Sequence, residues 1–482
     1  MTEATYDVIV VGAGPVGQTV ADRCGAADLT VAVVERELVG GECSYWACVP
    51  SKAMLRPVLA LSDVRRLDGA RQAVAGPVAA GGVFARRDHY VSDWDDIGQA
   101  AGLAAMGADL VRGHGRLAGP RRVVVSTADG ETVDLVARHA VVISTGSAAA
   151  VPDLPGVREA HPWTNRHATD TSVVPGRLAI VGGGGVAVEM ATAWQGLGSA
   201  VTLLVRSTIL PRMEPFVGEA VERGLRDSGV EVRIGVNVRE LVRGRNAAAV
   251  VIRLDDDSEL EVDEVMFATG RTPLTGDIGL ETVGLAAGSW LETDDTLTVT
   301  GVAGDWLYAV GDANRRALLT HQGKYQARVA AAVIAARAES APVDTTAWGR
   351  CVATADALAV PQVFFTDPEA ASVGMTEEQA GTAGHSVSVV DVEIGETVMG
   401  AKLYADGYRG RARMVVDDTR GVPLGVTLVG PGVGEILHSA TVAVAGQVPV
   451  DRMWHAVPCF PTVSELWLRL LEAYRDRESA SP

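Results

Sequence analysis

Short apolar runs that end in glycine turns set the pattern of the first part of the chain. Residues 8–11 read Val-Ile-Val-Val and lead into Gly-Ala-Gly-Pro-Val-Gly at 12–17. A stretch of helical periodicity follows, and the next apolar run, 30–34, ends at Glu35. A strand, a glycine turn, a helix, a second strand and an acid in this order predict a dinucleotide-binding βαβ unit.

The same pattern returns near the middle of the chain. Residues 178–181 form an apolar run, Gly-Gly-Gly-Gly-Val-Ala follows at 182–187, and a helical stretch leads to Val-Thr-Leu-Leu-Val-Arg at 201–206. Flavoenzymes that bind two nucleotides are built by repeating such units. The repeat therefore predicts an α/β chain with two Rossmann-like dinucleotide-binding domains.

The remaining apolar runs indicate how these domains continue. Runs that read as buried strands ending in turns lie at 141–146, 265–270 and 306–312. The proline-rich segment 151–155 reads as a crossover linker.

The pattern changes near residue 346, where the glycine turns stop. Alternating segments at 386–392 and 411–416 predict an antiparallel sheet, and the apolar periodicity of 465–474 predicts a helix. We expect this last part to be a separate α+β domain.

Composition limits the function classes that the chain can serve. Its 482 residues are 48% hydrophobic and carry a formal net charge of −18, which argues against disorder and against a nucleic-acid or anionic-membrane partner. An odd number of cysteines, five, is atypical of a secreted disulfide scaffold. Because we find neither a signal peptide nor a membrane span, we expect a cytoplasmic protein.

The first glycine turn is a candidate nucleotide site. Gly12, Gly14 and Gly17 would supply a tight turn, close backbone approach to a pyrophosphate, and close packing of helix on strand. The helix N-terminus would direct N–H groups at the phosphates, and Glu35 would accept hydrogen bonds from ribose hydroxyls. Glycine turns also occur for packing alone, which is the alternative interpretation.

The second turn differs from the first in ways that bear on the nicotinamide. Gly182 and Gly184 are present, but Ala187 stands at the third glycine position. The position that matches Glu35 is Val205, and Arg206 and Arg212 follow it. Without an acid to repel a 2′-phosphate, and with guanidinium groups nearby, the segment favours NADPH over NADH, although NADH stays open. The alternative is that both arginines are ordinary surface residues.

Cys43 and Cys48 are candidate redox thiols. Five helical steps leave two side chains about 140° apart, with Cα atoms roughly 8–9 Å from each other. A disulfide tolerates only about 7 Å, so a bond between them requires a distorted first turn and is easily reduced. A helix N-terminus would also lower the pKa of a thiol. The alternatives are two structural thiols or half of a metal site, and we expect no metal because no second Cys/His pair has suitable spacing.

Taken together, these motifs resemble the class I pyridine nucleotide-disulfide oxidoreductases, which include glutathione reductase, dihydrolipoamide dehydrogenase and mercuric reductase. The resemblance rests on residues 12–17, 43–52, 144–146, 182–189, 268–271, 310–312, 365–368 and 461–465. It implies a glutathione reductase-like fold, FAD at the first turn, NAD(P)H at the second, and a homodimer whose active site is shared between subunits. The implied domains are 1–150 for FAD, 151–275 for NAD(P), 276–345 for the second part of the FAD domain, and 346–482 for dimerisation.

The resemblance also implies roles for single residues. Cys48 would lie against the flavin, and Cys43 would be the interchange thiol that meets the substrate. Lys52 and Glu189 match an ion pair beside flavin N5, and Asp312 matches the acid that binds the ribityl chain. The helix that begins near Thr320 would direct its N-terminal end at the flavin pyrimidine. The other motif positions expected to contact a cofactor are Thr145, Gly146, Gly270, Arg271 and Gly311.

One position departs from the family. Its catalytic His stands just before Pro-Thr-x-Ser-Glu, where this chain has Phe460, so Glu465 loses its partner. Phenylalanine cannot move a proton. His455 is more simply an ordinary surface or core residue than a substitute, and Cys459 more simply a small buried hydrophobe than a further thiol. The bulky Tyr45-Trp46 pair between the cysteines is a further departure, expected to narrow the substrate mouth near Cys43.

These observations predict a FAD-dependent NAD(P)H oxidoreductase that passes hydride from NADPH to FAD and on to a Cys43–Cys48 disulfide. Its transfer of electrons to the final acceptor would differ from that of the family, because the catalytic His is missing. The final acceptor would be a quinone, another small acceptor or a protein disulfide with its own acid. The alternatives are a dihydrolipoamide dehydrogenase-like reductase that uses another acid, and a non-catalytic flavoprotein that acts as a redox sensor or binding partner.

Overall fold

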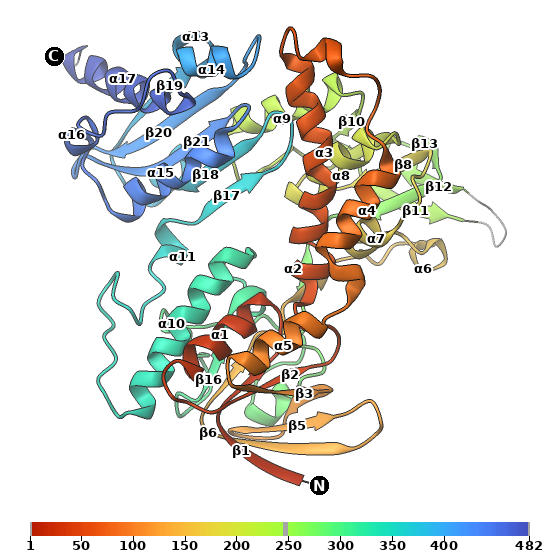
Figure 1. The fold of residues 1–482 in the computed structure, drawn as a ribbon, viewed down its shortest axis with the longest axis vertical. Helices are drawn as coiled ribbons and strands as arrows, with labels where there is room; N and C mark the ends of the chain where they lie inside the picture. Colours follow the sequence, from red (N-terminus) through yellow and green to blue (C-terminus); the bar gives the residue numbers. More distant parts are fainter. Residues whose placement is uncertain (1, 244–248, 481–482) are drawn as a thin grey trace. The chain divides into compact units, whose positions relative to one another are not determined.

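The computed structural model describes residues 2–243 and 249–480, and the chain divides into two compact units. The first unit comprises Met1–Pro50, Asp88–Ala149 and Arg271–Ala357, and the second comprises Ser51–Arg87, Ala150–Gly270 and Leu358–Pro482. Each unit is thus assembled from segments that are distant in the sequence (Figure 1).

A mainly parallel sheet forms the centre of the first unit. Its strand order is β3-β2-β1-β6-β5-β4, and β16 also pairs with β6. The strands β1, β2, β3, β6 and β16 pair in parallel, whereas β4 and β5 form an antiparallel extension beside β6. The strands are β1 (Thr2–Val11), β2 (Val31–Glu35), β3 (Ala108–Arg112), β4 (His114–Leu117), β5 (Arg122–Ser126), β6 (Thr132–Ile143) and β16 (Leu307–Ala309).

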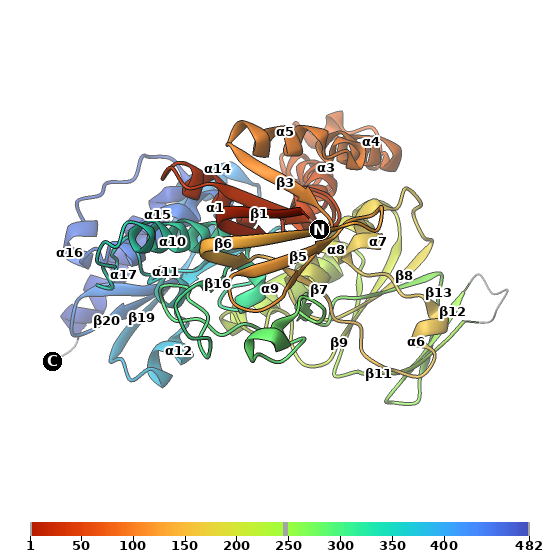
Figure 2. The same cartoon turned by 90° about the horizontal axis from the view of Figure 1, so that it is seen from below.

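Helices cover one face of this sheet. They are α1 (Pro15–Gly25), α5 (Ile97–Ala105) and α10 (Thr320–Ala338), and α1 lies beside α10 (Figures 1 and 2). Because successive strand residues point to opposite faces, Val8 and Val10 pack with these helices while Ile9 and Val11 join the core of the other face.

Shorter elements complete the first unit. They are α2 (Gly41–Tyr45), η2 (Ser92–Trp94), the ladder of β7 (Ser147–Ala149) with β15 (Arg271–Pro273), η3 (Leu280–Val283) and η4 (Gly311–Asn314). The helices α3 (Cys48–Arg66), α4 (Ala80–Tyr90) and α11 (Ala355–Leu358) contain the boundaries between the units.

The second unit contains the other parallel sheet, with the order β10-β9-β8-β14. Its strands are β8 (Arg177–Val181), β9 (Ala200–Val205), β10 (Glu231–Ile234) and β14 (Glu264–Phe267). Helices α8 (Gly185–Gly196) and α9 (Pro215–Asp227) pack on it, and Met54 and Leu55 of α3 share their core.

Beside this sheet stands an antiparallel ladder of three strands. The strands of the ladder are β11 (Val238–Val242), β12 (Val250–Leu254) and β13 (Glu259–Val262), and the short helix α6 (Val157–Ala160) packs on β11. The second unit also contains α7 (Asn165–Asp170), which contacts β14, and η1 (Arg71–Ala73).

The last part of the second unit is an antiparallel sheet of order β17-β18-β21-β20-β19 (Figure 1). Helix α15 packs on β18 and β21, and α17 packs on β19 and β20. The elements are β17 (Pro361–Phe364), β18 (Ala370–Gly374), α12 (Glu377–Thr382), β19 (Val387–Glu393), α13 (Ile394–Thr397), α14 (Met399–Tyr404), β20 (Arg411–Asp417), β21 (Val422–Val429), α15 (Val433–Ala445), α16 (Val450–Met453), η5 (Val463–Glu465) and α17 (Leu466–Ala480).

The predicted fold class, α/β with two Rossmann-like domains and a C-terminal α+β domain, is confirmed. The four domain ranges stay predictions, and residues 51–87, which we placed with the first domain, pack with the second unit. Within residues 2–243 and 249–480, no helix is both long and apolar enough to cross a membrane.

Candidate active site

The first glycine turn is closed by contacts that leave no room for side chains. Gly12 has φ +106°, and a Cβ atom there would lie 2.5 Å from the carbonyl oxygen of Ser144. A Cβ at Gly17 would collide with the carbonyl oxygen of Gly12. At Gly14, the N-cap of α1, a Cβ would meet no atom within 4 Å. The helix N-terminus therefore opens onto space, as a pyrophosphate site requires.

Two polar residues beside this turn, Thr145 and Glu35, are candidates to contact a bound nucleotide. The Thr145 hydroxyl is buried and has no hydrogen-bond partner among the described residues, which fits a group that a cofactor would satisfy. Glu35 is buried at the end of β2, where it accepts hydrogen bonds from the N–H groups of Ala13 (2.7 Å) and Glu37 (2.8 Å). Glu35 thus fastens the turn to β2, and its contact with a ribose stays a prediction.

Asp312 lies on η4, in the same unit as the first turn. Its Oδ2 atom accepts a hydrogen bond from the Ser147 hydroxyl, and Arg271 Nε lies 3.5 Å from the same oxygen. Arg271 also donates to the backbone oxygen of Ser147 at 2.6 Å. The carboxylate is therefore oriented by two partners, and Gly146 and Gly311 flank them with positive φ.

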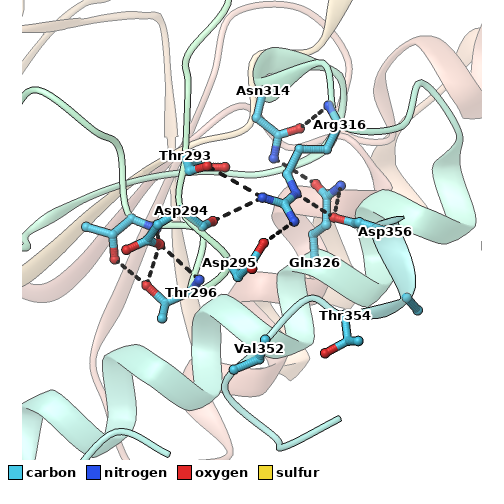
Figure 3. A network of polar contacts seen from close by, with 12 residues as sticks. Thr293, Asp294, Asp295, Thr296, Asn314, Arg316, Gln326, Val352, Thr354 and Asp356 are labelled. Carbon is cyan, nitrogen blue, oxygen red and sulfur yellow. Dashed lines mark hydrogen bonds and ion pairs between the residues drawn. The ribbon is translucent and has the colours of Figure 1, made fainter. Parts of the chain in front are cut away.

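Polar contacts around Asp356 and Gln326 (Figure 3) hold the turn η4, which carries Asp312. Asp356 accepts hydrogen bonds from Arg316 (2.9 Å), Gln322 (2.8 Å) and Gln326 (2.9 Å). Gln326 in turn accepts from the N–H of Gly311 at 2.8 Å. Burial raises the pKa of the Asp356 carboxyl above its ordinary value, although the Gln322 hydrogen bond and the Arg316 charge lower it.

The two cysteines lie on separate helices. Cys43 is in α2, the chain leaves helical geometry at Trp46 (φ −137°), and α3 begins at Cys48. Both cysteines are partly exposed, and Cys48 Sγ lies 3.2 Å from the hydroxyl oxygen of Thr320. Thr320 is the first residue of α10, so Cys48 lies at a helix N-terminus, where a thiolate is stabilised.

The bulky residues between the cysteines are buried in the single chain, and their expected effect on a substrate mouth stays a prediction. Tyr45 and Trp46 are 2% and 9% exposed and pack in a small core with Val91. The Tyr45 hydroxyl donates to the backbone oxygen of Val39. Burial of apolar rings outweighs exposure at the surface, and the two residues anchor the cysteine segment.

Sequence reasoning missed the polar clamp that holds this segment. Asp96 accepts from the N–H of Val39 at 2.6 Å, and Arg112 bonds both Asp96 oxygens at 2.7 and 2.9 Å. Gln99 donates to the Ser44 hydroxyl at 3.2 Å and accepts from Gln18. No motif marks these residues, because they become neighbours only when α5 packs beside the glycine turn.

Lys52 and Glu189 form an ion pair in the second unit. Lys52 Nζ lies 2.7 Å from Glu189 Oε2, and the N–H of Phe365 donates to Oε1 at 3.1 Å. The Glu189 side chain is 8% exposed and that of Lys52 is 38% exposed. The predicted pairing is present, and its place beside a flavin stays a proposal.

The second glycine turn is also shaped by steric need. A Cβ at Gly182 (φ +140°) would lie against the carbonyl oxygen of Ala268, and one at Gly185 would collide with the Phe364 ring. A Cβ at Gly184, the N-cap of α8, would meet nothing within 4 Å, while Ala187 is fully buried. The turn therefore has the close packing and the open helix N-terminus that a phosphate site requires, without a third glycine.

The roles of Arg206 and Arg212 in binding a nicotinamide nucleotide stay predictions. Val205 ends β9 and is buried, whereas Arg206 and Arg212 are exposed. Neither guanidinium has a hydrogen-bond or ion-pair partner among the residues that the structure describes. Gly270 lies three residues after β14 and has φ +150°, and its carbonyl oxygen accepts a hydrogen bond from the N–H of Ala150. Two unpaired guanidiniums are thus available to an anionic ligand.

The C-terminal segment places Glu465 in an unusual state. Its Oε1 atom accepts from Arg469 at 2.5 Å, but Oε2 is buried without a hydrogen-bond partner among the described residues. Phe460 is 73% exposed, and Cys459 and His455 are exposed as well. The interpretation of Cys459 as a buried hydrophobe is therefore wrong for the single chain.

Two parallel sheets with nucleotide-type turns, together with a paired-cysteine segment, define a class of two-nucleotide oxidoreductases with thiol chemistry. Among known families, the one described as "Pyridine nucleotide-disulphide oxidoreductase" matches residues 6–337, and its dimerisation domain matches residues 360–470. The chain belongs to this family of enzymes, which use FAD and NAD(P)H, and the dimerisation domain supports a homodimer.

Individual relatives agree with this assignment. Dihydrolipoyl dehydrogenase 3 of Pseudomonas aeruginosa is 31% identical and covers 95% of each chain, and mercuric reductase of Staphylococcus aureus is 27% identical over 96% of this chain and 81% of its own. The structure resembles LpdA from Mycobacterium tuberculosis (TM-score 0.82, 22% identity, 99% of this chain and 100% of that one). It also resembles HOCl-induced flavoprotein disulfide reductase RclA from Escherichia coli (TM-score 0.79, 23% identity, 97% and 99%). These two likenesses concern the fold.

Proposed function

We propose that this protein carries electrons from NADPH through FAD to a Cys43–Cys48 disulfide, and that its final acceptor is not a small disulfide. The observation that carries the second statement is at the C-terminal segment. Phe460 stands where the family resemblance places the acid–base His, and Glu465 Oε2 is buried without a hydrogen-bond partner among the described residues.

The proposed transfer of electrons from NADPH to FAD is supported by charged residues that match the family motifs. Bound FAD supplies a centre that accepts hydride and passes electrons on. Lys52 offers a compact ammonium whose position is fixed by Glu189 at 2.7 Å. Arg206 and Arg212 are the candidates to bind a 2′-phosphate, so NADPH is preferred and NADH is the poorer donor.

The thiol pair is supported by its surroundings. NADPH and one proton together convert the disulfide to two thiols, and release NADP⁺. Cys48 is favoured as the thiolate because its sulfur lies beside Thr320 at the N-terminus of α10. A quinone then takes two electrons and two protons, which restores the disulfide and yields a hydroquinone.

The step in which the dithiol passes its electrons to the final acceptor explains the choice of acceptor. In the homodimer the C-terminal segment of one copy is placed at the dithiol of the other, as the resemblance implies. Without an imidazole there, protonation of the leaving thiolate of a small disulfide slows by about 10²–10⁴-fold. A quinone has no thiolate leaving group, and a protein disulfide brings its own acid, so both escape this loss.

The test is an acceptor screen with the purified holoenzyme. Anaerobic titration with NADPH should give a two-electron-reduced protein with a long-wavelength band from a thiolate against oxidised flavin. Turnover with quinones should exceed turnover with lipoamide or glutathione disulfide. A holoenzyme that lacks the band contradicts the role of Cys48. Absence of turnover with any acceptor contradicts the enzymatic proposal and favours a sensor or binding role.

A further inference from the structure

The buried carboxylate of Asp356 is linked by hydrogen bonds to two elements that we expect to face the flavin: the turn that carries Asp312 and the N-terminal end of α10. Asp356 lies in the short helix α11, and its side chain is 2% exposed. It contacts Gln322, in the first turn of α10, and Arg316, in the loop between η4 and α10. A buried charge is costly unless it is paired, so this position requires an explanation.

The contacts of Asp356 connect it to two neighbouring elements, η4 and the first turn of α10. Through Gln326, whose amide oxygen accepts from the N–H of Gly311 and from Asn314, they fix the 3-10 turn that holds Asp312. Through Gln322 they fix the first turn of α10, whose first residue, Thr320, lies beside Cys48. One carboxylate thus holds both elements in place.

The charges around Asp356 are few. Arg316 donates to it at 2.9 Å and also reaches Asp295, whose side chain is 68% exposed. The Asp294 carboxylate is occupied by the hydroxyl of Thr296 and by backbone N–H groups. Asp356 is therefore the buried member of this charge set and Arg316 is partly buried, whereas solvent screens Asp295.

We propose that Asp356 and Arg316 are positioning residues that set the reduction potential of the bound flavin through their opposite charges at the N-terminal end of α10. The inference rests on the proposed function and on the family resemblance, which implies that this end of α10 faces the flavin. A helix N-terminus carries about half a positive charge. Asp356 offsets this charge and Arg316 reinforces it, so the pair sets how strongly the helix stabilises negative charge on reduced flavin.

The proposal gives the two residues opposite effects. In Asp356→Asn the opposing negative charge is gone and Arg316 is uncompensated, so reduction becomes easier. In Arg316→Gln the negative charge of Asp356 is uncompensated, so reduction becomes harder. Damage to packing alone would not produce changes of opposite sign, because both variants would loosen the same elements.

The experiment equilibrates each FAD-loaded variant anaerobically with a reference dye of known potential. We expect the ratio of reduced to oxidised flavin at fixed potential to rise about threefold to tenfold in Asp356→Asn and to fall by a similar factor in Arg316→Gln. A tenfold change corresponds to about 30 mV for a two-electron couple. Shifts of the same sign, or shifts below twofold in both variants, overturn the proposal.

Matched variants separate charge from folding. Arg316→Lys keeps the charge and should stay within twofold of the parent, and Asp295→Asn removes only the exposed partner and should do the same. If Asp356→Asn does not fold, the contrast between Arg316→Gln and Arg316→Lys decides, and equal shifts in both overturn the proposal. If the parent protein binds no FAD or is not reduced by NADPH, the proposed function itself fails. Normal reduction with unchanged potentials contradicts this inference alone.

Discussion

Lys52 Nζ lies 2.7 Å from Glu189 Oε2, and the other carboxylate oxygen accepts the N–H of Phe365. The ammonium also lies over the Phe365 ring, 5.1 Å from its centroid. Glu189 is buried and Lys52 is partly exposed, so the carboxylate orients the ammonium rather than the reverse. The helices α3 and α8 supply the two residues from positions far apart in the sequence.

Substitution of Lys52 by Met should slow hydride input. The variant removes a fixed positive charge from the proposed site of hydride arrival, and we expect the rate of flavin reduction by NADPH to fall about 10²-fold. Stopped-flow absorbance of the anaerobic holoenzyme measures this rate. Lys402→Met, at an exposed lysine of α14, is the matched control and should leave it unchanged. A rate within threefold of the parent for Lys52→Met would place Lys52 away from the reacting atoms.

Substitution of Arg206 by Ala should separate the two nicotinamide donors. Loss of a charge-assisted bond to the 2′-phosphate costs about 1.5–3 kcal/mol, which predicts a rise of roughly 10- to 100-fold in KM for NADPH. KM for NADH should stay within twofold. Arg223→Ala, at an exposed arginine of α9, is the control. Equal changes for both donors would mean that Arg206 does not contact the phosphate.

The βαβ units were predictable because their signals are local. A glycine turn after a fully apolar strand, as at Gly12 and Gly182, is dictated by backbone geometry within a few residues. The Lys52–Glu189 pair was predictable only through the family resemblance, since no local rule joins two distant helices.

The clamps could not be predicted, because they depend on tertiary packing. Asp96 precedes a helix and reads as an ordinary N-cap, yet its carboxylate bonds Arg112 and the N–H of Val39. Asp356 reads as a loop acid, and only the return of its segment onto α10 buries it. The burial of Tyr45 and Trp46 could not be predicted either, because it also depends on tertiary packing.

The contacts of Asp96 predict that the Val39 amide loses protection from hydrogen exchange in acid. The hydrogen bond from Arg112 holds the pKa of the Asp96 carboxyl below its ordinary value of 3.8. A lowered folded-state pKa gives stability that is fully present above about pH 4 and is lost as pH falls through the folded value. Hydrogen exchange at the Val39 amide, compared between parent and Asp96→Asn, should therefore differ at pH 7 by about 1–3 kcal/mol of opening free energy.

That difference should shrink as pH falls below 3.8 and vanish once pH is below the lowered pKa of the folded Asp96 carboxyl, because the parent carboxyl is then protonated as well. The exposed Asp68→Asn variant is the control, since its carboxylate bonds Gln72 and Arg71 far from Val39 in the sequence. A difference that persists undiminished in acid would mean that the Asp96 charge does not hold the cysteine segment.

Restoring an imidazole should restore part of the missing chemistry. Phe460→His places a titratable ring where the family has one, and we expect its N–H to donate to Glu465 Oε2, which is buried without a hydrogen-bond partner among the described residues. We expect turnover with a small disulfide such as lipoamide to rise about 10²-fold or more, with a new pH dependence near the pKa of histidine, about 6.5. Turnover with a quinone should change by less than twofold.

The role of Glu465 is tested in the same background. Adding Glu465→Gln to Phe460→His should remove most of the gain, because the amide orients the imidazole less strongly and cannot stabilise its cation. Phe460→Asn, a polar group that does not titrate, should give no gain. If Phe460→His folds and dimerises but its disulfide turnover equals that of Phe460→Asn, then the missing imidazole does not limit this enzyme. Its choice of acceptor is then set elsewhere, with the polar clamp around Cys43 as the next element to vary.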